Sequence, residues 1–552
     1  MKKKQILIVP LAVAVSGTIA FGAWVAYGLY DKQCQQEQQY QMLLKELATA
    51  RTQMHSMQQE VRHEAAGLVT SSSNWLHVQK RIEHAVVQVF SSVASINWLR
   101  PYRTPNEVLS CGSAFFINDR GDMLTNYHVV SQARSITVRL PQLGQEQYRA
   151  EIIGVCPERD VALIRLTAAA RAEVEKQLGT IAYLELGDSD LVGRTQEVMA
   201  LGFPLGRTSL KSTIGNISGW ESAGGQSLIQ LTSPLNPGNS GGPAVNNRGE
   251  VIGINSAGVM SAQNTGFFIP INEVHHILED LYRVPLLRKP MLGANFSIYL
   301  DTMREYLGNP PGGGWYVTQV YQNTLLEKAG VREGDVLYEV NGYALDCYGE
   351  VQVSWAPDSR VSTMDLLNRY NVGDTIAMVF YRRGEKIDIT LTLEDSFLLP
   401  VRRLFPDFEN IEYETLGGMV VVPLSLNVIG ALLEQDNSLG WLLARYARPD
   451  GQYEAAVVVT HIMPDSPAKD AKLLDPGLII DTVNGMPVRT LSEFRAAVIK
   501  GAAQKFLTLT TRYERRFAVL SYDDIRRKEE RLGYLNGFAP TALAKALGRA
   551  SE

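Results

Sequence analysis

The sequence predicts a mainly β protein with an N-terminal transmembrane helix, a β-barrel region and two small α+β modules after it. Three observations predict this fold class. An uncharged apolar stretch opens the chain, short strand-like runs separated by turn signals fill residues 75–285, and a Val-Asn-Gly segment occurs twice. With 552 residues the chain is too long for one hydrophobic core, so several domains are expected.

The N-terminus is the first predicted element. After "MKKKQ", residues 6–30 carry no charge, and 25 uncharged, mostly apolar residues are enough to span a bilayer. The three lysines are expected to stay cytoplasmic, so the rest of the chain is exported. We therefore predict a transmembrane signal-anchor over residues 1–31. A cleaved signal peptide is the alternative, because small residues occur near residues 20–23.

A glutamine-rich helical stalk is predicted over residues 32–74. Its apolar residues recur at alternating steps of three and four, which is typical of a short coiled coil over about three heptads. A solvated helical linker explains the same pattern equally well, because alanine and methionine make a weak seam. Both interpretations stay open at the level of the sequence.

Composition limits the classes of partner and cofactor. The net charge is −5 and the pI is about 6.0, so the chain lacks the basic surface that nucleic-acid binding needs. Four cysteines without CxxC spacing give no zinc motif, and one disulfide between Cys111 and Cys156 is an open alternative. Neither a P-loop nor an HExxH motif occurs, so neither ATP nor a metal is expected as a cofactor.

The internal repeat predicts two modules after the barrel region. "LLEKAGVREGDVLYEVNGYAL" (325–345) and "AKDAKLLDPGLIIDTVNGMPV" (468–488) align through Val-Asn-Gly, and "GDTIAMVFYRRGEKIDITLTL" between them predicts a hairpin that turns at "RRGEK". We place the barrel region at 75–288, the modules at 289–398 and 399–522, and a charged helical tail at 523–552.

One hydroxyl stands in an unusual glycine-rich stretch, "SPLNPGNSGGPAV" (233–245). An activated serine such as Ser240 needs a base, and the base needs an acid that orients it. His128 ends an apolar run in "MLTNYHVV", and Asp160 precedes another in "CPERDVALIRL". Each is weak evidence alone, but the order His, Asp, Ser in an all-β context is that of a serine protease triad.

These motifs carry a family resemblance. "TNYHVV", "RDVALIRL", "PGNSGGPAV" and "GEVIGIN" resemble the HtrA/Deg family of trypsin-like serine proteases, which have PDZ domains after the protease. The resemblance implies a chymotrypsin-like double β-barrel and a serine endopeptidase with nucleophile Ser240, base His128 and orienting Asp160. It also implies an oxyanion hole at Gly238, Asn239 and Ser240. Departures from the family pattern are Tyr127 before the histidine, which would crowd the site, and "GFPLG" at 202–206.

The resemblance extends to peptide binding. "MLGANF" (291–296) resembles the carboxylate-binding loop of a PDZ domain, so Met291, Leu292, Gly293 and Ala294 are predicted to receive a peptide C-terminus. "LGGMVVV" (416–422) is the candidate counterpart in a divergent second PDZ-like module, for which we favour a structural or oligomerisation role.

The function implied by the resemblance is ATP-independent cleavage of misfolded or regulatory proteins, with the PDZ modules recruiting or sensing C-termini. The implied setting is the bacterial inner membrane, crossed once, with the protease and PDZ domains in the periplasm. A homotrimer is implied as well. The alternative is a gated or vestigial protease that acts as a chaperone or peptide-binding scaffold.

Overall fold

The computed structural model of the protein describes residues 74–549, except for residues 224–225, 257–265 and 395–397. The predicted transmembrane helix (1–31) and nearly all of the predicted stalk (32–74) lie outside these residues. Within the described part of the chain, no helix is both long enough and apolar enough to cross a membrane.

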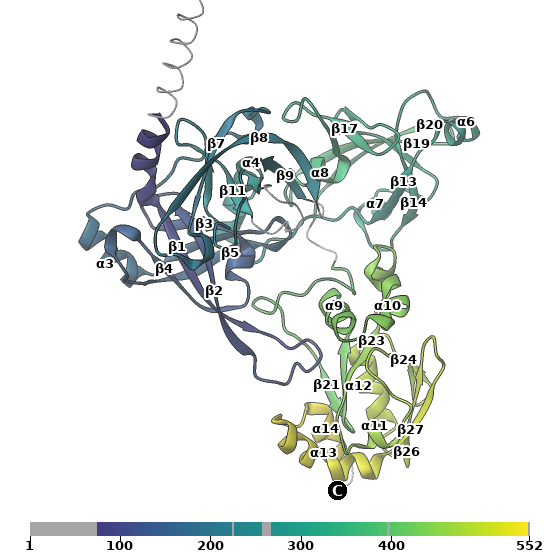
Figure 1. Cartoon of the computed structure of the whole chain (residues 1–552). Coiled ribbons are helices and arrows are strands. Elements are labelled where there is room, and N and C mark those ends of the chain that lie inside the picture. The colour runs from purple at the N-terminus through teal and green to yellow at the C-terminus, as the bar shows by residue number, and fades with distance from the viewer. Residues whose placement is uncertain (1–73, 224–225, 257–265, 395–397, 550–552) are drawn as a thin grey trace, which may run out of the picture. The chain divides into compact units, whose positions relative to one another are not determined.

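Two closed six-stranded barrels form the first half of the described chain (Figure 1). The strands of the first are β1 (Val86–Ser95), β2 (Asn106–Phe116), β3 (Asp122–Thr125), β4 (Ala133–Arg139), β5 (Tyr148–Cys156) and β6 (Val161–Leu166). The strands of the second are β7 (Glu197–Gly202), β8 (Lys211–Ala223), β9 (Gln226–Leu231), β10 (Pro243–Val245), β11 (Val251–Ser256) and β12 (Gly266–Pro270). The prediction of a β-barrel region is confirmed.

The barrels close because alternate residues of each strand are apolar and point inward. In the first barrel Val87 and Val89 of β1 meet Ala114 and Phe116 of β2 in one buried cluster. Helix α3 (Ala168–Leu178) follows β6, and two short helices, α4 (Ile271–His275) and α5 (Leu278–Arg283), follow β12. Cys111 and Cys156 are both free thiols, so the disulfide alternative was wrong.

The first of the two later modules is built on one antiparallel sheet. Its strand order is β13-β14-β15-β19-β20, with a short β16 paired to β15. The elements of this module are β13 (Ala294–Ile298), α6 (Asp301–Leu307), β14 (Trp315–Val320), α7 (Leu325–Lys328), β15 (Val336–Val340), β16 (Tyr343–Ala344), β17 (Glu350–Gln352), β18 (Arg360–Ser362), α8 (Thr363–Leu367), β19 (Thr375–Arg382) and β20 (Glu385–Thr392). The β19–β20 hairpin confirms the turn predicted at "RRGEK".

The second module repeats the plan and extends it. Its sheet runs β21-β22-β23-β24-β26-β27, with β25 paired to β24. The elements are β21 (Glu414–Leu416), β22 (Met419–Pro423), α9 (Leu426–Gln435), α10 (Gly440–Ala447), β23 (Val457–Ile462), α11 (Pro467–Asp470), β24 (Ile479–Val483), β25 (Met486–Pro487), α12 (Leu491–Lys500), β26 (Phe506–Thr511), β27 (Phe517–Ser521), α13 (Tyr522–Asn536) and α14 (Ala542–Arg549).

The C-terminal helices α13 and α14, drawn in yellow in Figure 1, belong to this second module. Ile525 of α13 and Leu543 and Leu547 of α14 are 1–3% exposed and pack in the same core cluster as Phe494 of α12. The sequence analysis separated residues 523–552 as a charged tail. That division was wrong, because these buried residues make both helices part of the module's core.

Candidate active site

His128 and Asp160 are brought together by the pairing of strands β3 and β6. Asp160 lies just before β6, and His128 lies in the short helix α2 (Tyr127–Val130) just after β3. One oxygen of Asp160 accepts the backbone N–H of His128 at 2.9 Å, and the other lies 2.8 Å from Nδ1 of the imidazole. A single carboxylate therefore orients both the backbone and the ring of the histidine.

The exposed fractions of the His128 and Asp160 side chains are compatible with His128 acting as a general base. The His128 side chain is 47% exposed, whereas that of Asp160 is 22% exposed. The carboxylate is thus mostly buried, while about half of the imidazole stays accessible to a substrate. Asp160 adopts φ +53°, a left-handed conformation that aspartate tolerates better than most residues.

Ser240 lies in the second barrel, on the loop between β9 and β10, and is 5% exposed. The backbone N–H of Ser113, in the first barrel, donates to the Ser240 carbonyl at 2.8 Å. A Cβ on Gly241 would collide with Ser113 O and Thr125 Oγ1 and lie 3.2 Å from the Asn126 amide. The nucleophile loop therefore packs directly against the segment that leads into His128.

Gly238 and Asn239 differ in how their amides are used. Gly238 has φ +99°, a conformation that favours glycine, and the preceding Pro237 carbonyl accepts a hydrogen bond from Leu205 N–H at 2.7 Å. The N–H and C=O of a trans peptide point in opposite directions, so the Gly238 N–H faces away from that turn. The Asn239 N–H donates to the Asn236 carbonyl at 3.0 Å. We therefore remove Asn239 from the predicted oxyanion donors and keep Gly238 and Ser240.

Tyr127, expected to crowd the site, is turned inward. Its side chain is part of the first barrel's core, and its ring lies edge-on to Phe405 with 5.9 Å between ring centroids. The other departure, "GFPLG", forms the turn at Phe203–Leu205 against which Gly238 packs. The expected crowding by Tyr127 is therefore not seen, because its side chain is buried in the barrel core.

Asn255 is a supporting residue that the sequence analysis missed. It is fully buried on β11, its backbone bonds Gly241 and Gly242 at 2.9 and 2.8 Å, and its side-chain amide donates to the Leu201 carbonyl at 3.0 Å. It ties the glycines after the nucleophile to the second barrel. The signal for it was a polar residue inside the apolar run "GEVIGIN".

The predicted carboxylate-binding loop of the first module has a rigid backbone. Gly293 has φ +86°, and a Cβ there would collide with the Thr324 side chain. Its carbonyl accepts from Tyr321 N–H at 2.9 Å, and the Leu292 carbonyl accepts from Leu326 N–H at 3.1 Å. Ala294 then begins β13, which ends the sheet order and has one strand neighbour, β14, among the described strands. Its outer edge is the kind of surface to which a peptide strand adds.

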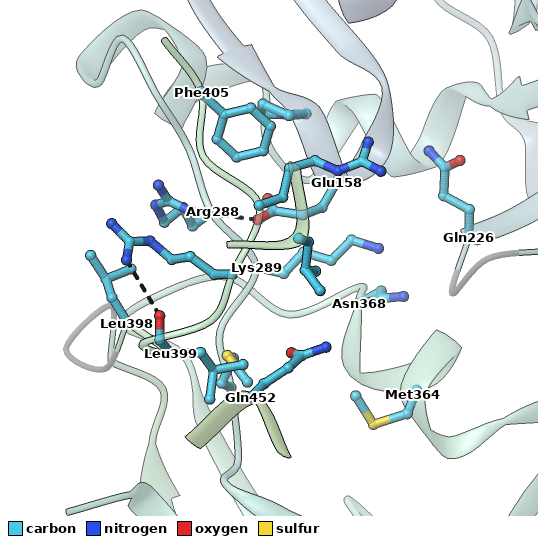
Figure 2. Close-up of a pocket in the computed structure, with 15 residues that line it drawn as sticks. Glu158, Gln226, Arg288, Lys289, Met364, Asn368, Leu398, Leu399, Phe405 and Gln452 are labelled. Carbon is cyan, nitrogen blue, oxygen red and sulfur yellow. Dashed lines mark hydrogen bonds and ion pairs between the residues drawn. The ribbon is translucent and has the colours of Figure 1, made fainter. Parts of the chain in front are cut away.

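A cavity of about 630 Å³ adjoins this loop (Figure 2). Met291 of the loop and Met364 of α8 contribute apolar lining, and Arg288, Lys289 and Arg402 bring positive charge. Arg288 lies 4.0 Å from the Glu158 carboxylate. Burial lowers the pKa of Lys289 and raises the pKa of Glu158, the residue two positions before Asp160.

The second module carries the same loop, but the chain itself fills it. Gly418 has φ +86°, lies against Ser466 and accepts Met463 N–H at 2.8 Å, as Gly293 does with Thr324 and Tyr321. Strand β21, however, pairs with β22 along the edge that β13 leaves open in the first module. The Gly417 N–H donates at 2.8 Å to the carboxylate of Glu529 from α13.

Comparison with known proteins identifies two domains in the chain. A trypsin-like peptidase domain matches residues 112–254, and a PDZ domain matches residues 407–534. A probable periplasmic serine endoprotease, DegP-like, of Hahella chejuensis is 28% identical over 420 residues, covering 72% of this chain and 78% of the relative. The chloroplastic protease Do-like 2 of Arabidopsis thaliana is 28% identical over 437 residues, covering 77% and 69%.

Among solved structures, the HtrA-type protease AlgW with a tripeptide superposes with a TM-score of 0.46 at 24% identity, covering 58% of this chain and 96% of that one. The peptidase match includes His128, Asp160 and Ser240 within its bounds, and the PDZ match includes the self-filled loop. The trypsin-like peptidase domain, the PDZ domain and the similarity to DegP-like proteases support an HtrA/Deg-type protease with PDZ domains, and this chain is a serine endopeptidase.

Proposed function

We propose that this protein is an ATP-independent endopeptidase of the cell envelope that cleaves misfolded or regulatory proteins, and that its residues His128, Asp160 and Ser240 perform the chemistry. The observation that supports this best is the two-point contact of Asp160 with His128, at 2.9 and 2.8 Å, beside the nucleophile loop. The names of relatives such as the DegP-like protease support the periplasmic setting.

The proposed reaction uses each residue once. The Ser240 hydroxyl attacks the scissile carbonyl while Nε2 of His128 takes its proton. The Gly238 and Ser240 amides receive the charge that develops on the carbonyl oxygen, and each such donor lowers the barrier by about 3 kcal/mol. His128 then returns the proton to the leaving amine, and water repeats the sequence on the acyl-enzyme. Asp160 stabilises the imidazolium throughout.

The two PDZ modules are proposed to have different roles. The first, with its open β13 edge and its rigid 291–294 loop, receives the C-terminus of a protein or peptide. The second is structural, because β21 and Glu529 occupy the corresponding positions. Residues 1–31 are proposed to anchor the chain in the inner membrane, and the assembly is proposed to be a homotrimer.

The test of the proposed activity is cleavage of casein by the full-length protein and by Ser240→Ala, with fluorophosphonate labelling of both. We expect labelling and cleavage with the wild-type protein and neither with Ser240→Ala. Ser222→Ala, which removes an exposed hydroxyl from β8 of the same barrel, is the matched control and should behave like the wild type. Cleavage by Ser240→Ala at the wild-type rate would refute the assignment.

The same experiment separates the alternative of a vestigial protease that acts as a scaffold. Tyr127 was the feature that favoured it, and that side chain lies in the core of the first barrel. A wild-type protein that binds peptides but is not labelled by the fluorophosphonate would support the scaffold alternative. Fractionation with N-terminal sequencing tests the anchor, and light scattering of Ser240→Ala tests for three times the 61.1 kDa chain mass.

A further inference from the structure

Ser113 lies at the point where the two barrels meet. It is on β2 of the first barrel, is fully buried, and makes hydrogen bonds through all of its polar groups. Its N–H donates to the Ser240 carbonyl at 2.8 Å, and its hydroxyl donates to the Gly238 carbonyl at 2.7 Å. The hydroxyl also accepts the Phe203 N–H at 3.0 Å, and the Ser113 carbonyl accepts the Thr125 hydroxyl at 2.7 Å.

We propose that Ser113 is a positioning residue for catalysis, which fixes the Gly238 and Ser240 amides in the orientation that the oxyanion hole requires. This inference rests on the proposed function, and it assigns a residue outside the triad and outside the hole. Ser113 holds the nucleophile loop at both ends, because the carbonyls of Gly238 and Ser240 are bound by the hydroxyl and the amide of the same residue.

The need for such a residue follows from the conformation of Gly238. Glycine visits positive φ readily, so a peptide group beside it can rotate with little steric penalty. Two hydrogen bonds oppose that rotation here. Leu205 N–H holds the Pro237 carbonyl on one side of Gly238, and the Ser113 hydroxyl holds the Gly238 carbonyl on the other. Together they fix both dihedral angles and hence the direction of the Gly238 N–H.

The Ser113 hydroxyl lies in a closely packed region. A Cβ on Gly202 would lie 3.0 Å from the Ser113 hydroxyl and 2.9 Å from Asn239 Cα. Removal of the hydroxyl would leave the Gly238 carbonyl and the Phe203 N–H buried without this partner, and buried polar groups favour a rearrangement that restores a hydrogen bond. The peptide beside Gly238 is where such a rearrangement is expected, because glycine imposes little steric barrier to its rotation.

The experiment compares Ser113→Ala with Ser91→Ala in the full-length protein. Ser91 is a buried serine on β1 of the same barrel, and its hydroxyl has no hydrogen-bond partner among the described residues. Loss of an oxyanion donor lowers kcat by about 10²- to 10³-fold, and misorientation should cost less than loss. We expect Ser113→Ala to lower kcat per titrated active site by about 10- to 100-fold with KM nearly unchanged, and to slow fluorophosphonate labelling similarly. Ser91→Ala should change neither.

A purely structural role would instead lower the melting temperature and the fraction of active sites, while each remaining site kept its kcat. Ser113→Ala with a wild-type kcat per site, or an equal loss in Ser91→Ala, overturns the positioning role. If Ser113→Ala does not fold, Ser113→Cys decides, because a thiol is a weaker donor of similar shape. Its kcat should fall below wild type, and a wild-type value overturns the inference. If the wild-type protein itself is not labelled, the proposed function fails as well. Failure of the proposed function is thus distinguishable from failure of the positioning role, in which the wild-type protein is labelled and Ser113→Ala keeps its kcat.

Discussion

The backbone amide of Gly417 donates a 2.8 Å hydrogen bond to the carboxylate of Glu529, a residue 112 positions further along the chain. Gly417 lies in the loop that matches the predicted carboxylate-binding loop of the first PDZ module. The second module thus supplies its own carboxylate, from helix α13, where the first module is expected to take one from a peptide. The two modules share a backbone plan and differ in whether the ligand position is filled.

This difference predicts one peptide site per chain. In full-length Ser240→Ala, peptides with a free apolar C-terminus should bind with a stoichiometry near one, and amidated peptides should bind more weakly. A carboxylate forms charge-assisted hydrogen bonds, which are about twice as strong as neutral ones. Calorimetry measures both quantities. Equal affinity for acid and amide forms would contradict the carboxylate site, and two equivalent sites would contradict closure of the second module.

A matched pair of glycine substitutions tests which loop binds. Gly293→Ala and Gly418→Ala each place a Cβ at φ +86° against a neighbouring side chain, Thr324 in the first case and Ser466 in the second. Gly293→Ala should lower peptide affinity at least 10-fold. Gly418→Ala should leave it unchanged, although both variants lose some stability. A comparable loss of affinity in both would indicate a general effect of strain.

Removal of the charge from Asp160 should inactivate the enzyme while it stays folded. Asp160→Asn can still accept one hydrogen bond from His128 through its amide oxygen. Its NH₂ group then takes the place of the second carboxylate oxygen and favours the wrong imidazole tautomer. A loss of about 10³- to 10⁴-fold in kcat is expected, with an unchanged circular dichroism spectrum. Asp119→Asn, on the exposed turn before β3, is the control and should retain full activity. An active Asp160→Asn protein would refute the triad.

The stability of the second module should depend on the pH through Glu529. Burial, with a contribution from the nearby Glu414 carboxylate, raises the pKa of Glu529 to about 7 from an ordinary 4.5, against the opposing effect of the Gly417 N–H. Folding therefore favours the protonated acid. The stabilisation that the protonated acid contributes is complete below pH 4.5 and falls as the pH rises toward 7. Above pH 7 this group causes no further change in stability. The total change is about 3 kcal/mol at most.

Hydrogen–deuterium exchange of the β21–β22 hairpin, corrected for the intrinsic effect of pH, measures this change. Protection should fall between pH 4.5 and 7 in full-length Ser240→Ala. It should stay level when Glu529→Gln is added, because glutamine accepts the Gly417 hydrogen bond without a charge. A parallel fall in both proteins would assign the pH dependence to another group.

Much of the fold could be predicted because its signals are local. The hairpin at 375–392 turns at Arg383 and Gly384, which have φ +48° and +85°. The repeated Val-Asn-Gly segments become tight turns in which Asn341 and Asn484 also take positive φ. His128 and Asp160 could be paired because each stands at the end of an apolar strand run.

Contacts between distant segments were the part that could not be predicted. Glu529 lies in a charged helix, and its sequence neighbours give no sign that its carboxylate is buried against Gly417. The ring of Tyr127 packs edge-on against Phe405, nearly 280 residues away. Ser113 looks like an ordinary strand residue, since a hydrogen bond to a loop of the other barrel leaves no trace in local periodicity.

Because the site is divided between two closed barrels, the enzyme can lose its activity while both barrels stay folded. His128 and Asp160 belong to one barrel and Ser240 to the other, and each barrel has its own ring of strand pairs and its own core. A displacement of about 1 Å between the two barrels would lower the activity by about 10²-fold without unfolding either barrel. Reversible inactivation therefore requires little free energy, because neither barrel has to unfold. As denaturant is added, enzymatic activity should be lost before secondary structure.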